Sequence, residues 1–223
     1  MKFFFHKSVK DRFPDLWVGL GFISGLTNVQ KNMFTQKRDL IYNNLKQKYS
    51  LDTLKDLEIV RIYRDFFWEL GIDPTKNRPA AEALIRRVLK GKSIPRINCV
   101  VDAYNLASME SGVPLAAFDA DHLKGDLTMR FAETNEIFLG IGMKEAKILK
   151  GNELIINDQN QIIAIYPYRD AEDTKVTKIT KNVTLLICGA PGLEKDLLNS
   201  AGDLALDYIT QLCGGSGNYQ IYE

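Results

Sequence analysis

The stretch that decides the fold covers residues 98–119 and reads NCVVDAYNLASMESGVPLAAFD. It predicts an apolar-faced helix followed by a short buried strand. Asn98, Asp102 and Asn105 lie at spacings of four and three, so a helix places all three on one face. Burying carboxamides and a carboxylate is costly unless hydrogen bonds satisfy them. Two alternatives follow: this polar face holds neighbouring loops of the protein, or it binds a ligand.

Outward from this stretch, the apolar periodicity predicts helices before it and strands after it. The first part is expected to contain strands at residues 3–6 and 16–24, and helices at 31–48, 52–70 and 80–90. The later part is expected to contain strands near 115–118, 125–131, 137–140, 153–156, 162–167 and 183–188, a helix at 193–213 and an edge strand at 219–222. Between these last two, the glycine-rich residues 214–217 are expected to form a flexible loop that ends the helix. The fold class is therefore α+β, a mixed sheet with packed helices in one domain over residues 1–223. We divide it into a strand–helix part at about 1–93, a middle part at about 94–188 and a C-terminal helix and edge strand at 189–223.

The overall charge gives no general attraction to nucleic acid, because the formal net charge is only +1. An RNA contact would need a local basic patch, and the sequence offers two groups. The first comprises Lys31, Lys37, Arg38, Lys46 and Lys48, and the second Arg78, Arg86, Arg87, Lys90, Lys92 and Arg96. Such runs are usually solvated helix faces.

The three cysteines, Cys99, Cys188 and Cys213, are widely separated, and two of them sit in apolar runs. This placement is typical of free buried thiols. With two histidines and no CxxC pair, the sequence offers no metal-ligand spacing. The N-terminal residues are interrupted by charges and indicate strands, not a signal peptide, so we expect a cytoplasmic protein without a membrane span.

Four short motifs in order resemble a known domain. They are VVDAYN at residues 100–105, LAAFD at 115–119, MRFA at 129–132, and TKVT at 174–177 with TKNV at 180–183. Over about residues 94–188 the chain resembles the editing domain, the B3/B4 region, of the phenylalanyl-tRNA synthetase beta subunit. The resemblance implies a B3/B4-like mixed sheet. The remaining residues look like the extra helices of free-standing proteins built on that domain.

Three of the four recognition elements of that family have changed in this chain. The family's helix asparagine falls on Asn105 and is retained. Its histidine falls on Ala116, its glutamate on Leu186, and its glycine-rich loop near residues 167–171, which here read PYRDA. In the family this pocket hydrolyses tRNA that bears tyrosine in place of phenylalanine. The resemblance therefore implies a pocket here whose ligand or chemistry differs.

The run YPYRD at residues 166–170 stands where the family has its pocket wall. An arginine binds a carboxylate or phosphate through paired hydrogen bonds, and tyrosines stack on a ring or a base. The alternative is a strand end with a surface pair between Arg169 and Asp170.

The resemblance also implies roles for individual residues. Asn105 is the catalytic candidate, because it would orient water or the substrate carbonyl. Asp102 would contact an ammonium group or support Asn105, Arg169 would hold a phosphate or carboxylate, and Tyr168 would stack. The remaining candidates for substrate binding are Ser108, Arg130 and Thr174.

Two functions of different classes fit these observations. The first is a free-standing tRNA-editing-like domain that binds an aminoacyl-tRNA end or a free amino acid and hydrolyses mischarged aminoacyl-tRNA in trans. The alternative is a non-catalytic small-molecule or RNA-binding module that kept the pocket and lost the hydrolytic residues. Ala116 and Leu186 favour the alternative. Neither function requires a cofactor or a metal.

Overall fold

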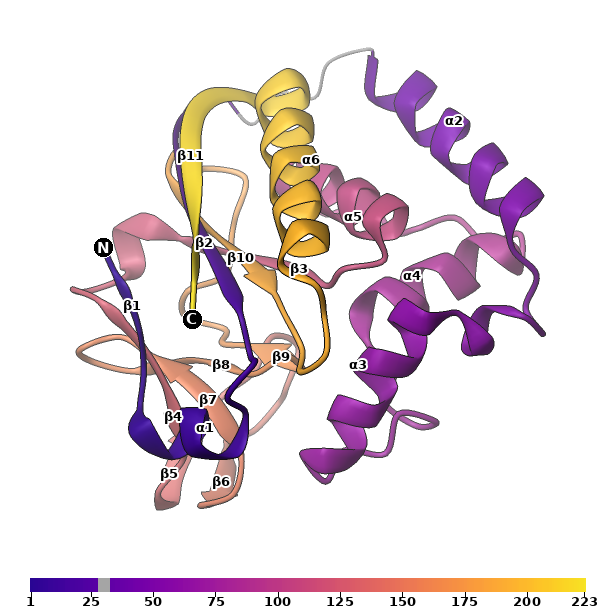
Figure 1. Cartoon of the computed structure of the whole chain (residues 1–223). Helices are drawn as coiled ribbons and strands as arrows, with labels where there is room; N and C mark the ends of the chain where they lie inside the picture. Colours follow the sequence, from indigo (N-terminus) through magenta and orange to yellow (C-terminus); the bar gives the residue numbers. More distant parts are fainter. Residues whose placement is uncertain (28–32) are drawn as a thin grey trace.

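A four-stranded antiparallel sheet in the order β11–β2–β10–β3 forms the centre of the protein (Figure 1). Its strands are β2 (Val18–Leu26), β3 (Leu115–Asp119), β10 (Val183–Cys188) and β11 (Gly214–Tyr222). The computed structural model describes residues 1–27 and 33–223. Because the N-terminal β2 lies between β10 and the C-terminal β11, the two ends of the chain share one sheet, as expected for a single α+β domain.

A second sheet of five strands has the order β1–β4–β7–β8–β9. The strands are β1 (Phe3–Phe5), β4 (Leu127–Phe131), β7 (Leu154–Asn157), β8 (Ile162–Ile165) and β9 (Arg169–Asp170). Only the pairing of β1 with β4 is parallel; the other neighbours are antiparallel. A separate hairpin of β5 (Thr134–Phe138) and β6 (Lys147–Lys150) extends from this sheet. This five-stranded sheet is the mixed sheet that the predicted fold class contains.

The described helices are α1 (Lys7–Arg12), α2 (Met33–Lys48), α3 (Glu58–Glu69), α4 (Ala80–Leu89), α5 (Cys99–Ser111) and α6 (Lys195–Cys213). Short 3-10 turns occupy Leu54–Asp56 and Ala120–His122. In Figure 1, α6 and α5 lie beside the four-stranded sheet, and α2 to α4 form the purple group at the other side. Helix α6 lies close to β11, since a Cβ at Gly202 would be 2.7 Å from the ring of Tyr219.

The stretch that decides the fold forms the helix and strand that the sequence predicts. Asn98 is the N-cap of α5, because its side chain accepts a hydrogen bond from the Val101 N–H at 3.0 Å. Its amide also donates to the Val176 carbonyl at 3.1 Å. Gly112 ends the helix with a φ of 77°, a left-handed conformation that glycine adopts at no steric cost. Strand β3 then follows, buried along its whole length.

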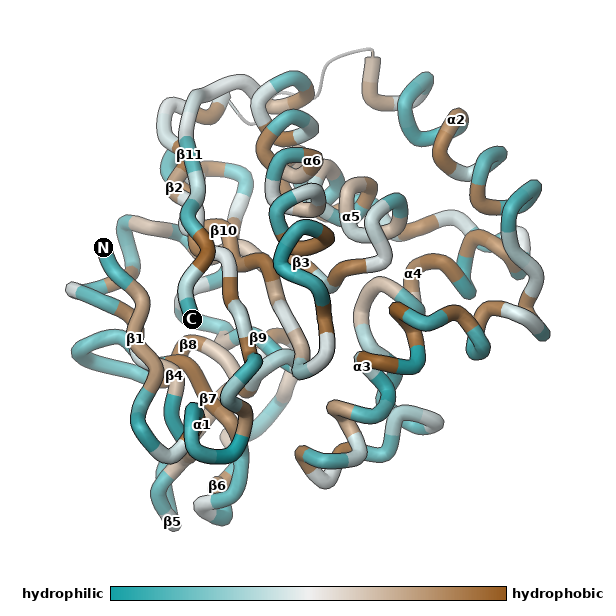
Figure 2. The backbone as a smooth tube through the Cα atoms, viewed as in Figure 1, coloured by the Kyte–Doolittle hydropathy of each residue, from teal (hydrophilic) through white to brown (hydrophobic). Residues whose placement is uncertain are grey.

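Hydrophobic residues gather in the interior of the molecule, as the brown segments of β7 and β10 show (Figure 2). Glu82 is an exception, because its side chain is buried in this interior with only 2% of its surface exposed. It accepts paired hydrogen bonds from Arg64 at 2.9 and 2.8 Å and a third from Arg86 at 2.6 Å. These contacts join α3 to α4. They also give the buried carboxylate the cationic partners without which its burial would be strongly destabilising.

One predicted helix is interrupted in the structure, and the predicted start of another lies outside the described residues. The helix expected over residues 52–70 is interrupted at Leu57, whose backbone is extended (φ −62°, ψ 134°), so a 3-10 turn precedes α3. The helix expected from Lys31 is described from Met33 onward, and Lys31 itself lies outside the described residues. Helix α1 was not predicted, because only Val9 of its six residues is buried and no periodicity marks it.

The glycine-rich residues 214–217 are part of β11, so the prediction of a flexible loop there is wrong. They pair with the end of β2, Gly214 opposite Leu26 and Gly217 opposite Ile23. A Cβ at Gly217 would lie 2.1 Å from the Phe22 carbonyl oxygen. The missing side chain therefore lets the edge strand approach its neighbour closely.

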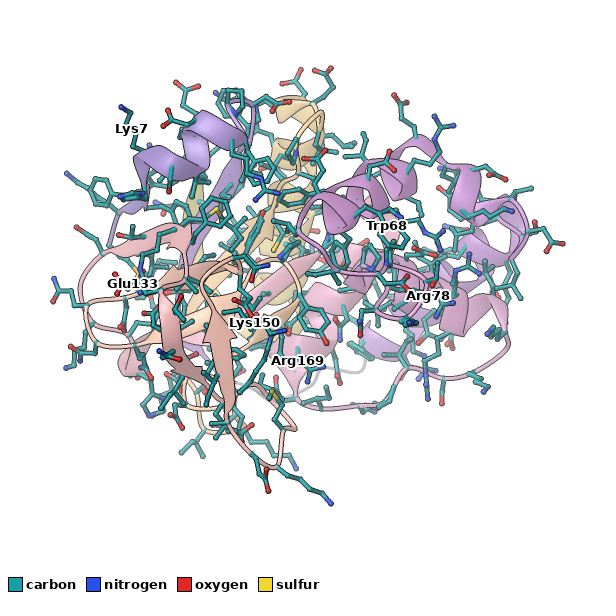
Figure 3. All side chains as sticks on the ribbon, turned by 90° about the horizontal axis from the view of Figure 1, so that it is seen from below. Lys7, Trp68, Arg78, Glu133, Lys150 and Arg169 are labelled. Carbon is teal, nitrogen blue, oxygen red and sulfur yellow. A yellow bond between two sulfur atoms is a disulfide. The ribbon has the colours of Figure 1, made fainter. Side chains whose placement is uncertain are left out.

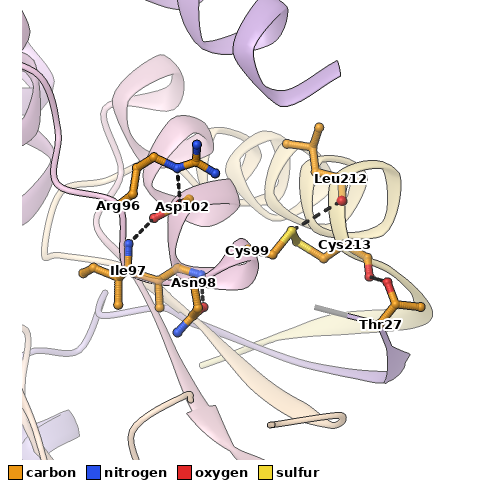
Figure 4. The surroundings of a disulfide bond; sticks show 9 residues. Thr27, Arg96, Ile97, Asn98, Cys99, Asp102, Leu212 and Cys213 are labelled. Atoms are coloured by element: carbon orange, nitrogen blue, oxygen red, sulfur yellow. Dashed lines mark hydrogen bonds and ion pairs between the residues drawn. A yellow bond between two sulfur atoms is a disulfide. The ribbon is translucent and has the colours of Figure 1, made fainter. Parts of the chain in front are cut away.

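Cys99 and Cys213 form a disulfide that joins the first turn of α5 to the end of α6 (Figure 4). Their Cα atoms are 5.8 Å apart although 114 residues separate them in the chain. The prediction of free thiols is therefore wrong for this pair, because only the packing of α5 on α6 brings them together. Cys188 is free and buried, as predicted.

Candidate functional site

A pocket of about 260 Å³ lies where β3 and β10 meet the turn between β8 and β9. We call it the sheet pocket; its lining includes Ala116, Leu186, Tyr168, Arg169, Asp170 and Cys188. Ala116 and Leu186 are direct partners in the ladder between β3 and β10. The two positions at which the synthetase resemblance expects a histidine and a glutamate therefore lie on one wall, and this wall is apolar.

Asp170 supplies a carboxylate to this otherwise largely apolar pocket. Its side chain is part-buried, and no residue in the described ranges 1–27 and 33–223 donates a hydrogen bond to it. Burial raises the pKa of Asp170 from 3.8 to about 7, against the opposing effect of the neighbouring Arg169 charge. A carboxyl group with this pKa exchanges protons readily at neutral pH, as a general acid or base does.

Arg169 is held at the mouth of the sheet pocket by two contacts. Its Nη1 donates a hydrogen bond to the Ile141 carbonyl at 3.0 Å, and its guanidinium carbon lies 5.2 Å from the centre of the Tyr168 ring. A Cβ at Gly140 would be 2.4 Å from the Arg169 Cδ, so this glycine leaves room for the arginine stem. Seen from below, Arg169 lies between the β-strands and the N-terminal helices (Figure 3). These contacts leave donors of the guanidinium available for an anionic group.

Two buried tyrosines hold the backbone next to the sheet pocket, at Cys188 and Gly189. The Tyr166 hydroxyl donates to the Gly189 carbonyl at 2.7 Å, and the Tyr63 hydroxyl donates to the Cys188 carbonyl at 2.5 Å. Burial, and then the charge of Asp170, raises the pKa of the Cys188 thiol well above its ordinary value. The thiol is therefore protonated at neutral pH and is a poor nucleophile.

The predicted polar face of α5 lies at a different pocket. This second pocket, of about 280 Å³, is enclosed by α2, by the linker at residues 91–96 and by α5. We call it the helical cleft, and both Asp102 and Asn105 line it. The structure thus places Asn105 in the helical cleft and Tyr168 and Arg169 in the sheet pocket, so it does not bring the predicted residues into one site.

Asp102 holds the linker against α5. Its carboxylate accepts a hydrogen bond from the Ile97 N–H at 2.9 Å and lies 3.7 Å from the Arg96 Nε (Figure 4). Burial raises the pKa of Asp102 from its ordinary value, and these two contacts oppose the change. With Asn98 as the helix cap, two of the three polar residues of this face hold loops of the protein. Asn105 differs, because its side chain makes no hydrogen bond within the described part of the chain.

The other three predicted residues lie elsewhere. Ser108 is buried and donates to the Val113 carbonyl at 2.8 Å, so it fixes the end of α5. Arg130 donates to both carboxylate oxygens of Glu136 at 2.9 and 2.6 Å, beside a third pocket. Thr174 is fully buried, and its hydroxyl has no hydrogen-bond partner among the described residues. It lies next to β3, because its carbonyl accepts from the Asp119 N–H at 2.8 Å.

Residues 1–27 and 33–223 contain neither a metal-binding cluster nor a membrane-spanning helix. No group of three or more His, Cys, Asp or Glu side chains there is placed to hold a metal ion. No described helix combines the length and the apolar composition needed to cross a bilayer.

Comparison with known proteins identifies the domain. The model of the family described as B3/4 domain matches residues 62–214, more than half of the chain. The chain belongs to the B3/4 domain family. The match contains α5, which lines the helical cleft, and β3 and β10, which form a wall of the sheet pocket.

Relatives of this B3/4 domain include phenylalanine–tRNA ligase beta subunits. That of Fusobacterium nucleatum is 33% identical over 95 residues, which are 43% of this chain and 12% of that protein. That of Aliivibrio fischeri is 29% identical over 151 residues, 57% of this chain and 19% of that protein. The chain thus matches less than a fifth of the length of either relative.

A crystal structure shares the fold. An N-terminal fragment of the phenylalanyl-tRNA synthetase beta subunit from Pyrococcus horikoshii aligns with a TM-score of 0.53 and 16% sequence identity. The alignment covers 97% of this chain and 50% of the fragment. At this identity the likeness shows the fold, and it confirms the B3/B4-like architecture predicted from the motifs.

Proposed function

We propose that the sheet pocket of this B3/4 domain binds an α-amino acid, either free or as the aminoacyl end of a tRNA. The observation that supports this proposal most is the Asp170 carboxylate, which has no hydrogen-bond donor among the described residues and lies beside Arg169 in a pocket whose other walls are largely apolar. Ligand pockets commonly combine apolar walls with a few polar groups that fix orientation.

The charges of the pocket complement an amino acid. Asp170 would accept hydrogen bonds from the α-ammonium group, while Ala116 and Leu186 would contact the side chain. Arg169 would bind the carboxylate of a free amino acid or a phosphate of a charged tRNA, because its donors suit both. Tyr168, which Arg169 covers on one side, would stack on the terminal base.

The same arrangement would support deacylation of a charged tRNA. Asp170 would take a proton from a water molecule as the water oxygen adds to the ester carbonyl carbon. It would return the proton to the ribose oxygen as the carbon–oxygen ester bond breaks, giving the free amino acid and tRNA. The pKa of about 7 suits both steps at neutral pH. A tRNA partner and a cytoplasmic location form part of this proposal.

A non-catalytic binding module is the second candidate. The side chains of Ala116 and Leu186 carry no group that can move a proton. The resemblance to the synthetase domain implies a histidine and a glutamate at these two positions. In this case Asp170 and Arg169 would bind the amino acid or the tRNA end without hydrolysis.

Deacylation of a panel of correctly and incorrectly charged tRNAs tests the proposal, with the wild type beside Asp170→Asn and Arg169→Met. We expect hydrolysis of at least one species, reduced at least a hundredfold by Asp170→Asn. The matched control is Asp65→Asn, which changes an exposed carboxylate on α3 and should leave the rate unchanged. The same assay with Asn105→Ala tests the catalytic role that the sequence predicts for Asn105.

The two candidates give different results. Hydrolysis by the wild type that Asp170→Asn abolishes supports deacylation. Silence across the panel, together with binding of a free amino acid that Asp170→Asn weakens, supports the binding module. If the protein neither hydrolyses any charged tRNA nor binds a free amino acid, both candidates are refuted.

A further inference from the structure

The helical cleft brings together cationic residues that are far apart in the sequence. Four cationic side chains line it, and they come from both of the basic groups recognised in the sequence. Arg38 and Lys46 are on α2, and Lys92 and Arg96 are on the linker between α4 and α5. Among the described residues, the acidic side chains that line the cleft are Asp39 and Asp102.

The acidic side chains do not balance all of these charges. The Arg38 guanidinium donates to Asp39 at 2.9 and 2.8 Å, and Arg96 lies 3.7 Å from Asp102. Lys46 and Lys92 form no ion pair with any residue in the described part of the chain. Two cations therefore face a pocket of about 280 Å³ without an ion-pair partner in residues 1–27 and 33–223.

The walls of the helical cleft are apolar and aromatic. Phe34, Arg38, Tyr42 and Lys46 recur every four residues and form one stripe of α2 that faces the cleft. Leu106 and Met109 of α5 form the opposite wall. The Tyr42 hydroxyl accepts a hydrogen bond from the Ile94 N–H at 3.3 Å, which ties the linker to α2 across the opening.

The Asn105 carboxamide adds a neutral polar group to the same space. It has no hydrogen-bond partner among the described residues, although it is only part-exposed. A carboxamide has two donors and an accepting oxygen, so a bound molecule could use both kinds of group. The cleft thus combines an aromatic wall, a cationic rim and one unsatisfied amide.

We infer that the helical cleft is a second binding site, for a small molecule that carries a phosphate or carboxylate on an aromatic body. The body lies between Tyr42 and the α5 wall, the anion lies between Lys46 and Lys92, and Asn105 hydrogen-bonds to the ligand. Helix α2 lies outside the residues that the family model matches, and the helical cleft and the sheet pocket have no lining residue in common, so the two sites are separate.

Isothermal titration calorimetry with two probe pairs tests this inference on the full chain. Adenosine monophosphate is compared with adenosine, and phenylpyruvate with 2-phenylethanol. We expect at least one anion to bind with a Kd below about 1 mM and at least tenfold more tightly than its neutral counterpart. The anion that binds with the lower Kd shows whether the site prefers a phosphate or a carboxylate.

Substitutions inside and outside the helical cleft test whether the anion binds there. Lys92→Met should weaken binding of the anion at least tenfold, whereas Lys90→Met, an exposed lysine outside the cleft, should leave it unchanged. Asp170→Asn in the sheet pocket should also leave it unchanged, which separates this site from the proposed function. The inference is overturned if neither anion binds below 1 mM, if the neutral partners bind equally well, or if Lys92→Met has no effect.

Discussion

Replacing Asp170 by asparagine should make the protein more stable at alkaline pH. The carboxylate is part-buried without a hydrogen-bond donor among the described residues, so its charged form is poorly solvated in the folded state. Asparagine keeps the size of the side chain and removes the charge. A residue that lowers stability in a pocket is typical of a functional site, because such sites often retain groups that folding alone would not favour.

The magnitude follows from the pKa. Burial raises the pKa of Asp170 from 3.8 to about 7, and at 1.36 kcal/mol per unit this shift is worth at most about 4 kcal/mol. Because the side chain is partly accessible to water, we halve this figure to about 2 kcal/mol.

The direction of the pKa shift determines the pH range over which the stability of the folded protein changes. The unfolded chain releases the Asp170 proton near pH 4, whereas the folded protein keeps it until about pH 7. The folded state therefore loses stability relative to the unfolded state as the pH rises through this window, and the loss is complete above pH 7. The asparagine variant does not titrate and avoids this loss.

Urea unfolding followed by tryptophan fluorescence, at pH 4.5 and at pH 8, measures the effect. The gain in unfolding free energy of Asp170→Asn over the wild type should be larger at pH 8 than at pH 4.5 by about 2 kcal/mol. An equal gain at both pH values, or a loss at pH 8, would refute the assignment of Asp170 as a buried carboxyl group of raised pKa.

Three further predictions concern the framework. Glu82→Ala leaves two arginines of α3 and α4 without their buried partner, so it should lower the unfolding free energy by about 3 kcal/mol. A loss below about 1 kcal/mol in urea titrations would contradict the assignment of a buried ion pair. Gly189→Ala would place a Cβ 2.0 Å from the Trp17 carbonyl oxygen, so thermal denaturation should show a loss of about 2 kcal/mol, and an unchanged Tm would argue against this close approach. Thiol titration of the denatured, unreduced protein should find one thiol per chain, Cys188, and three after reduction; three thiols without reductant would show that the disulfide is absent.

The sequence predicts the fold well where local patterns and burial agree. In residues 98–119 the N-cap asparagine, the helical periodicity and the buried strand all point to the same structure, and the structure has all three. The prediction is wrong at residues 214–217, where the glycines suggest a loop. Their role depends on how closely β2 approaches, and β2 is about 190 residues away in the chain.

The two pockets are harder to predict from the sequence than the fold, because they depend on how elements distant in the chain pack together. The motif order placed Ala116, Leu186 and the run at residues 166–170 near one another, and they do line one pocket. Asn105, on α5, lines the other pocket, since α2 packs along that side of α5. The raised pKa of Asp170 depends on burial by β-strands and loops that no local pattern reveals. In the sequence, the one indication of a site at Asp170 is its place at the end of the run of aromatic residues and arginine at residues 166–170.

Binding of an aminoacyl-adenosine analogue with an amide in place of the ester tests the central claim most directly, since it cannot be hydrolysed. Calorimetry on a panel of such analogues and of free amino acids should find a ligand for the wild type. Arg169→Met and Asp170→Asn should each weaken its binding at least tenfold, while Lys92→Met in the helical cleft should not. If no analogue or amino acid binds, or if binding is unchanged in both sheet-pocket variants, the sheet pocket is not an amino-acid site.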